Sequence, residues 1–277
     1  MSGPLLCLTD VTSSFSIGAG TATSVDDKSF PASNVLDYTH PLRELRTANT
    51  SSNANQVVLT NTSGSAITIG GVFVDNFNWT TYSVEFNSTT ISGFSQVDPR
   101  NGRPKFFVRT ATDNIIANNG SIVIEKPLGN STHDGSSLFK VGGVSVWAES
   151  GLRTLPGRDP QDVNWTITLP QIEVSGQSSS PEIVDVGVPY VTANFKQISY
   201  LHQYSEPEDT ENQSDVIHEI YRRGSLPLIY VEQPDDLYYK GHFSYCMRVK
   251  NLSSGVTTTN KLIDLVTDMP LSLVETL

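Results

Sequence analysis

The sequence predicts an all-β protein, and three observations support that prediction. Short segments rich in Val, Ile, Thr, Phe and Tyr recur along the chain, separated by clusters of Asn, Gly, Ser and Asp. Most of these segments alternate apolar with polar residues, as strands with one buried face do. The 277 residues are 37% hydrophobic and only 17% charged, which is enough apolar chain for one large or two ordinary domains.

Residues 1–150 are expected to form a β-sandwich. Its strands, predicted from the alternation, are Gln56–Thr60, Ala66–Phe73, Thr81–Phe86, Lys105–Thr110, Ser121–Glu125 and Leu138–Ala148. Residues 151–164 contain several Gly and Pro residues and lack apolar periodicity, so we expect them to be a linker.

Residues 165–277 are expected to form a second, smaller β-rich domain with one short helix. Its predicted strands are Trp165–Leu169, Leu226–Val231, His242–Lys250 and Lys261–Val266, and residues 188–200 have an extended pattern. Ser214 can cap a helix that Gly224 ends, and Arg222 and Arg223 suit its C-terminal end because cations stabilise that end of the helix dipole. The alternative interpretation of these arginines is a carboxylate-binding pair.

The charge distribution indicates which partners to expect. The formal net charge is −11 and the Lys and Arg residues are scattered, so the sequence predicts no nucleic-acid binding. The apolar runs are of strand length, so no membrane insertion is predicted. The first residues lack a positively charged segment followed by an apolar one, so we expect synthesis in a cytoplasm without a secretory signal.

The two cysteines, Cys7 and Cys246, are expected to be buried thiols because no CxxC motif or Cys/His cluster surrounds either of them. A disulfide between the two ends of the chain is the alternative.

The sequence predicts no catalytic residues, metal site or cofactor, and therefore no enzyme. None of the five histidines has a spacing typical of a metal site, and no Gly-x-Ser-x-Gly motif occurs. Carboxylates at Asp26-Asp27, at Glu206 with Glu208-Asp209, and at Asp235-Asp236 offer oxygen ligands for calcium, but none has EF-hand spacing. Solvated acidic turns are the favoured interpretation of these pairs.

A turn at Phe30–Asp37 reads Phe-Pro-Ala-Ser-Asn-Val-Leu-Asp, and residues 138–147 read Leu-Phe-Lys-Val-Gly-Gly-Val-Ser-Val-Trp. The turn resembles the opening, and the second segment the closing strand, of a discoidin-type (galactose-binding-like) β-sandwich. The resemblance covers residues 10–150 and implies a binding or assembly module.

The order of the whole chain is similar to that of tail-tip proteins of long-tailed bacteriophages. The sandwich is followed by the Asn164-Trp165 strand, a helix before Gly-Ser-Leu-Pro-Leu-Ile-Tyr-Val (224–231), and Tyr-Tyr-Lys-Gly-His-Phe-Ser-Tyr (238–245). The resemblance implies a virion component of the distal tail or baseplate that links the tail tube to receptor-binding or fibre proteins. Its expected partners are other tail proteins and further copies of itself in a homo-oligomeric ring. No segment matches a tube-forming hairpin, which leaves the ring-forming role open.

The alternative function is a carbohydrate-binding module that recognises a cell-surface glycan. In discoidin-like modules the strand that corresponds to residues 72–78 ends in a loop with Asn and aromatic residues. A ligand loop would therefore include Asn76, Asn78, Trp79 and Tyr82. Packing in the core is the competing interpretation of these aromatic residues.

Overall fold

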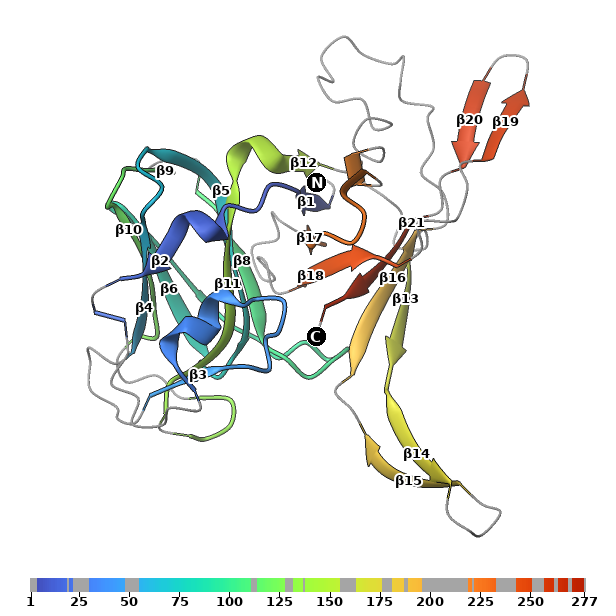
Figure 1. Cartoon of the computed structure of the whole chain (residues 1–277), viewed down its shortest axis with the longest axis horizontal. Helices are drawn as coiled ribbons and strands as arrows, with labels where there is room; N and C mark the ends of the chain where they lie inside the picture. Colours follow the sequence, from blue (N-terminus) through green and yellow to red (C-terminus); the bar gives the residue numbers. More distant parts are fainter. Residues whose placement is uncertain are drawn as a thin grey trace.

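The structure is a computed structural model that describes residues 4–18, 20–21, 30–47, 55–110, 114–127, 132–136, 138–154, 163–175, 181–186, 189–195, 219–220, 222–232, 243–250, 257–261, 264–268 and 271–276. It confirms the all-β prediction, since antiparallel sheets make up the fold. Figure 1 shows a sandwich on one side and a further sheet beside it.

The sandwich consists of an outer sheet and a middle sheet. The outer sheet has the order β2 (Phe15–Ile17), β4 (Gln56–Asn61), β10 (Ser121–Glu125), β6 (Thr81–Phe86) and β7 (Thr89–Phe94). The middle sheet has the order β3 (Leu45–Arg46), β11 (Lys140–Ala148), β5 (Ile67–Phe77) and β8 (Lys105–Val108), and β9 (Ile115–Ile116) also pairs with β5. Short 3-10 turns lie at Thr12–Ser14, Ala32–Leu36 and Glu149–Gly151.

The third sheet, here called the C-terminal sheet, has seven strands. Their order is β12 (Leu152–Thr154), β1 (Leu5–Cys7), β17 (Leu228–Val231), β18 (Ser244–Val249), β21 (Leu271–Glu275), β16 (Tyr190–Phe195) and β13 (Val163–Thr168). Beyond it are the hairpins β14 (Gln171–Ser175) with β15 (Pro181–Val186), and β19 (Thr257–Lys261) with β20 (Asp264–Asp268).

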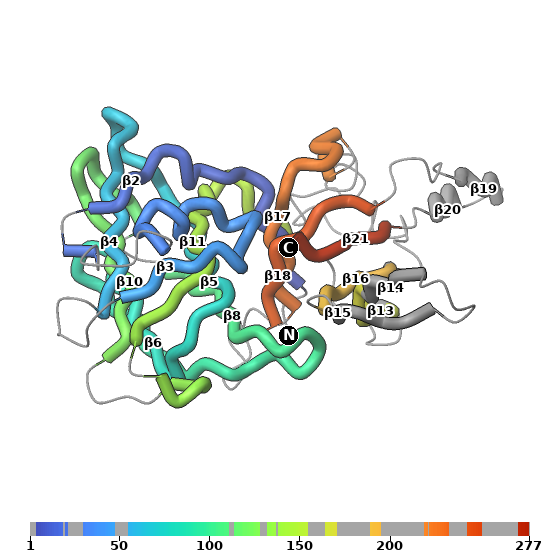
Figure 2. Tube along the Cα trace, turned by 60° about the horizontal axis from the view of Figure 1, so that its bottom comes forward, coloured from blue at the N-terminus to red at the C-terminus, as the bar shows by residue number. Residues whose placement is uncertain are grey.

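The three sheets stack in layers because the strands of the middle sheet are buried on both faces. Val72 and Val74 of β5 face the outer sheet and join the sandwich core. Phe73, between them, faces the other way and joins a second cluster with Phe107 and Trp147. That cluster also contains residues of the C-terminal sheet, among them Leu5, Cys7, Ile229, Val231 and Cys246. Because its side chains alternate, β5 packs against the outer sheet with one face and against the C-terminal sheet with the other. Figure 2 shows β5, β8 and β11 between the outer strands and the C-terminal sheet.

Two strands of the C-terminal sheet come from parts of the sequence for which we expected other roles. β1 lies at the start of residues 1–150, which were expected to belong wholly to the sandwich, and β12 lies in the expected linker 151–164. Leu5 and Leu6 are both buried, on opposite faces of β1. A continuous apolar run of this kind is typical of a strand covered on both sides, and alternation does not reveal it.

The predicted helix is present in part within the described residues. Residues 219–220 and 222–223 are helical, and Gly224 follows with a φ of 64°, which ends the helix as predicted. Ser214, the expected cap, lies outside the described residues, as do the paired carboxylates at 26–27, 208–209 and 235–236.

The structure confirms that both cysteines are buried and free. Cys7 is opposite Ile229, and Ile229 is opposite Cys246, so the thiols lie on strands that are separated by a third. Adjacent strands are about 4.8 Å apart, which places the two Cα atoms about 9.6 Å from each other. A disulfide requires a Cα separation below about 7 Å, so the register excludes the disulfide alternative.

Candidate functional site

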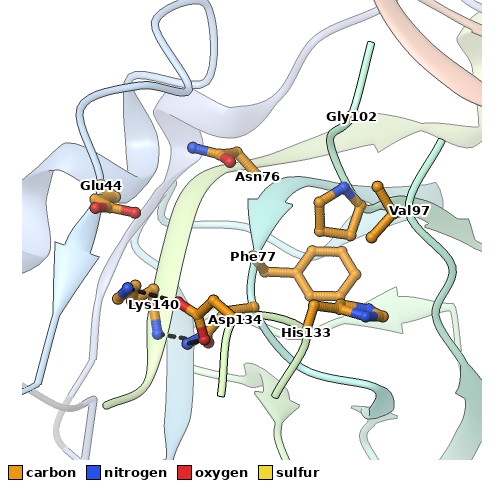
Figure 3. Close-up of a pocket in the computed structure, with 10 residues that line it drawn as sticks. Glu44, Asn76, Phe77, Val97, Gly102, His133, Asp134 and Lys140 are labelled. Carbon is orange, nitrogen blue, oxygen red and sulfur yellow. Dashed lines mark hydrogen bonds and ion pairs between the residues drawn. The ribbon is translucent and has the colours of Figure 1, made fainter. Parts of the chain in front are cut away.

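A pocket of about 330 Å³ lies at one end of the sandwich, where β5 ends and β11 begins. It is lined by Glu44, Asn76, Phe77, Asn78, Val97, Gly102, Pro104, His133, Asp134 and Lys140 (Figure 3). Phe77 and Val97 lie together on one side of it, and Asp134 and Lys140 lie opposite. The pocket thus combines an apolar wall with a polar rim, as small-molecule sites commonly do.

Asn76 reaches the pocket because β5 changes its alternation there. Its φ is 53°, in the left-handed region that Asn tolerates better than most residues. The kink lets Phe77, rather than Asn76, continue the inward series of Val72 and Val74 into the core. The side-chain amide of Asn76 then donates a hydrogen bond of 2.7 Å to the carbonyl of Pro41.

Asn78, Asp134 and Lys140 form a hydrogen-bonded group at the rim. The amide of Asn78 donates to Asp134 at 3.2 Å and to the Leu138 carbonyl at 2.8 Å, and its oxygen accepts from the Lys140 backbone at 3.1 Å. Lys140 Nζ lies 2.6 Å from Asp134 Oδ2.

Asp134 is held in its charged form. Desolvation by itself raises the pKa of Asp134, but hydrogen bonds from Lys140, Ser136 and Asn78 outweigh it and lower the pKa to about 2. Asp134 is therefore an anion at neutral pH and accepts hydrogen bonds, rather than donating a proton.

Ser95 and His133 are in contact, but the hydrogen bond does not activate the serine. The hydroxyl of Ser95 donates to the carbonyl of Trp79, so Ser95 Oγ accepts from His133 Nε2 at 2.9 Å. A general base would need the opposite direction. Desolvation lowers the pKa of His133, which keeps the ring neutral at neutral pH.

The structure brings together half of the ligand loop that the sequence predicts. Asn76 and Asn78 line the pocket, but Trp79 and Tyr82 are buried in the sandwich core. Trp79 stacks on Phe139 with a ring-centroid distance of 4.6 Å, and Tyr82 stacks on Phe106 at 3.9 Å. Trp79 and Tyr82 therefore pack in the core, as the competing interpretation of these aromatic residues predicted.

Sequence reasoning did not find Glu44, Asp134 and Lys140 as pocket residues. Asp134 lies outside the predicted strands, and Lys140 lies within the predicted strand Leu138–Ala148. Lys140 and Asp134 lie about 60 residues from Asn78, and only the pairing of β11 with β5 brings them together. No local pattern carries that information.

A second cluster of charged side chains is buried where the loop before β8 meets β21. Glu275 accepts hydrogen bonds from Asn101, Arg103 and Lys105, and from the backbone of Val191. Lys105 Nζ also lies 3.7 Å from Asp98, and Arg103 lies 3.6 Å from Asp75. These charged side chains are at most 5% exposed, so the cluster joins layers of the fold and presents no surface to a ligand.

Within the described residues, no group of three or more His, Cys, Asp or Glu side chains is arranged to hold a metal ion. No described helix is long and apolar enough to cross a membrane.

Comparisons with known proteins give little further information. No protein-family model and no curated protein sequence matches the chain. Among solved structures, the chain is similar to a family 89 glycoside hydrolase from Clostridium perfringens in complex with 2-acetamido-1,2-dideoxynojirmycin. That match has 14% sequence identity and a TM-score of 0.30, and covers 50% of this chain and 14% of the hydrolase chain. A similarity at this level does not show a shared activity.

Proposed function

We propose that this chain is a structural component of the tail tip of a long-tailed bacteriophage, where it links the tail tube to receptor-binding or fibre proteins. The observation that supports an assembly role is a β-arm, formed by β14 and β15. It continues the edge strand β13 and its neighbour β16 of the C-terminal sheet away from the body (Figure 1). The tail-tip assignment itself rests on the resemblance in the order of the sequence segments.

The arm favours contact with another chain on physical grounds. Within the described residues, β14 pairs only with β15. A two-stranded ribbon is marginally stable in water, and its outer edges offer unpaired backbone groups. A neighbouring chain that covers or extends the ribbon would satisfy those groups, as in other strand-addition interfaces.

The base of the arm is firmly attached to the body, as a structural role requires. Trp165 of β13 packs against Tyr230 and Tyr245, with ring centroids 5.9 and 5.3 Å away. The guanidinium of Arg100 lies 4.2 Å from the Trp165 ring centroid and donates to Glu232 at 2.8 Å. The loop before β8 therefore fixes both the arm and the C-terminal sheet to the sandwich.

Shortening the arm tests this proposal. Replacing residues 171–186 with Asn-Gly keeps β13 and β16 but removes the ribbon beyond them. We expect the full chain to form species larger than one copy in sedimentation velocity, and the shortened chain to self-associate more weakly with an unchanged melting temperature. Equal self-association of both chains, or a full chain that is a single copy at every concentration, would contradict the proposal.

The pocket supports a second candidate function, the glycan-binding module. Its rim offers an amide, a carboxylate and an ammonium group beside an apolar wall, which suits a neutral ligand with many hydroxyl groups. Titration calorimetry against simple hexoses and N-acetylhexosamines tests this function. Binding that is lost in Lys140→Met, and kept in a variant of an exposed residue outside the pocket such as Ser92→Ala, would support it. No heat with any sugar would count against it.

A further inference from the structure

An apolar stripe continues along β13 beyond the part that the body covers. Trp165, Ile167 and Leu169 occupy alternate positions, so in an extended chain they share one face. Trp165 is packed against the aromatic residues of the C-terminal sheet. Ile167 and Leu169, further toward the arm, are 50% and 54% exposed. The stripe therefore presents apolar surface that the described part of this chain does not cover.

The sequence around the stripe is acidic. Residues 163–195, from β13 to β16, contain Glu173, Glu182 and Asp185 but no Lys or Arg. A partner for this region therefore needs an apolar contact beside positive charge, because an acidic partner would be repelled.

A surface of that kind exists on this chain, at the helical turn that precedes β17. Arg222 is exposed there, and Leu226 is 58% exposed. Arg223, between them, is half-buried and donates a hydrogen bond of 2.8 Å to the Pro227 carbonyl. We call Arg222, Arg223 and Leu226 the basic patch. The helix dipole explains why arginines stabilise this end of the helix, but it does not explain the exposed leucine beside them.

The stripe and the basic patch lie at different places on the C-terminal sheet. β13 forms one edge of the sheet, and β17 lies toward the other edge, separated from β13 by three strands. In Figure 1 the arm extends below the sheet, and the orange helical turn before β17 lies above it. A contact between the two surfaces would therefore join different copies of the chain.

We propose that Ile167 and Leu169 of one copy dock on the basic patch of a second copy, in a head-to-tail contact. This inference rests on the proposed assembly function and specifies its homotypic interface. The charge argues for this occupant, because a chain of net charge −11 repels copies of itself except where a basic surface meets an acidic one. A head-to-tail contact uses different surfaces on the two copies, so it leads to a ring when the rotation closes.

Paired variants of the full chain test the contact. The stripe variant is Ile167→Ser with Leu169→Ser, and the patch variant is Arg222→Glu with Leu226→Ser. The matched control is Leu42→Ser with Arg43→Glu, an adjacent exposed leucine and arginine in the sandwich. Mass photometry over a range of concentrations measures self-association, and circular dichroism melting verifies that each variant folds.

We expect the stripe and patch variants each to weaken self-association by about tenfold or more, while the control associates like the natural chain. Mixing the two variants is the decisive step. Each variant keeps one intact surface, so the mixture is expected to form a species of two copies that neither variant forms alone.

Three results would overturn the contact. One is a mixture that contains only single copies, and another is a patch variant that associates like the natural chain. In both of these the natural chain still assembles, so the assembly function would stand. The third result, a natural chain that is a single copy throughout, would count against both the contact and the assembly function.

Discussion

Glu275 of β21 is at the centre of the buried charge cluster, where it accepts hydrogen bonds from the loop before β8, from β8 and from β16. Desolvation alone would raise the pKa of Glu275, but the charges of Lys105 and Arg103 outweigh it and lower the pKa. Glu275 therefore contributes stability above the pKa that it has in the unfolded chain, and this stability is lost as the pH falls through its lower folded value. Asp75 differs, because neither of its carboxylate oxygens has a hydrogen-bond partner.

Glu275→Gln is expected to destabilise the fold by about 3–5 kcal/mol, because it leaves Lys105 and Arg103 buried with less compensating charge. Urea unfolding at neutral pH measures this change.

Asp75→Asn is the matched comparison. Burial raises the pKa of Asp75, so that group stabilises the fold at low pH and the contribution is lost as the pH rises. We expect Asp75→Asn to be neutral or stabilising at pH 7, and equal losses in the two variants would contradict this assignment.

The two thiols are expected to be inert in the folded protein. Burial raises the pKa of Cys246 to about 12 and also raises the pKa of Cys7, and only the thiolate reacts readily. A thiol-reactive chromophore at pH 8 should therefore label neither residue until urea unfolds the chain, and should then label both. Fast labelling of the folded protein, or a missing thiol after unfolding, would contradict the buried and unpaired assignment.

At single positions, the type of a residue in the sequence did not determine whether it lines the pocket or packs in the core. Asn76 and Asn78 were predicted at a ligand loop, and they line the pocket. Trp79 and Tyr82 were predicted beside them, yet both are in the core. Aromatic side chains serve both as core residues and as ligand platforms, so residue type alone does not separate the roles.

At the scale of single elements, β11 packs very closely against the turn that contains Pro41, and Gly142 is the point of contact. A β-carbon at Gly142 would overlap the carbonyl oxygen of Pro41, the same oxygen that accepts the hydrogen bond of Asn76. The glycine thus lets the turn before β3 lie directly on β11 and form one wall of the pocket.

Gly142→Ala is expected to cost about 1–3 kcal/mol, because the backbone of the turn must move. The amide resonance of Asn76 should shift in the same variant. Gly64→Ala is the comparison, since a β-carbon there meets nothing within 4 Å although its φ of 84° makes alanine strained. Gly64→Ala should lower stability but leave the Asn76 resonance in place. A shift of that resonance in both variants would show that the effect is not local.

Most strands could be predicted, including buried ones: the predicted strands 66–73, 105–110 and 138–148 overlap β5, β8 and β11 of the middle sheet. The alternation at 56–60, 81–86 and 121–125 corresponds to β4, β6 and β10 of the outer sheet. β7, Thr89–Phe94, was missed because it contains few large apolar residues, although Asn87 with a φ of 52° marks the turn before it. β1 was missed because its apolar run is only three residues long.

For the whole molecule, the sequence could predict a second β-rich unit but not how it joins the first. β1 and β12, which precede and follow the sandwich strands in the sequence, both belong to the C-terminal sheet. Glu275 and Arg100 form contacts between segments more than 100 residues apart. Pairings over such distances depend on the finished fold and not on any local pattern.

Self-association of the whole molecule is expected to strengthen as salt is raised from about 0.01 M to about 0.15 M. Over that range the Debye length falls from about 30 Å to about 8 Å, which screens the repulsion between copies of net charge −11. The repulsion comes from the whole net charge of −11, whereas only the two arginines of the basic patch contribute attraction, and the apolar contact of the stripe is not screened. Sedimentation equilibrium at the two salt concentrations measures the change, and association that is independent of salt would show that net charge does not control it.

The native mass of the full chain, measured by light scattering together with electron microscopy of any large species, tests the assembly role most directly. A mass that is a whole-number multiple of 30.2 kDa, with closed rings in the images, is the expected result. A mass of one copy at every concentration and salt level would contradict the assembly role and favour the glycan-binding module.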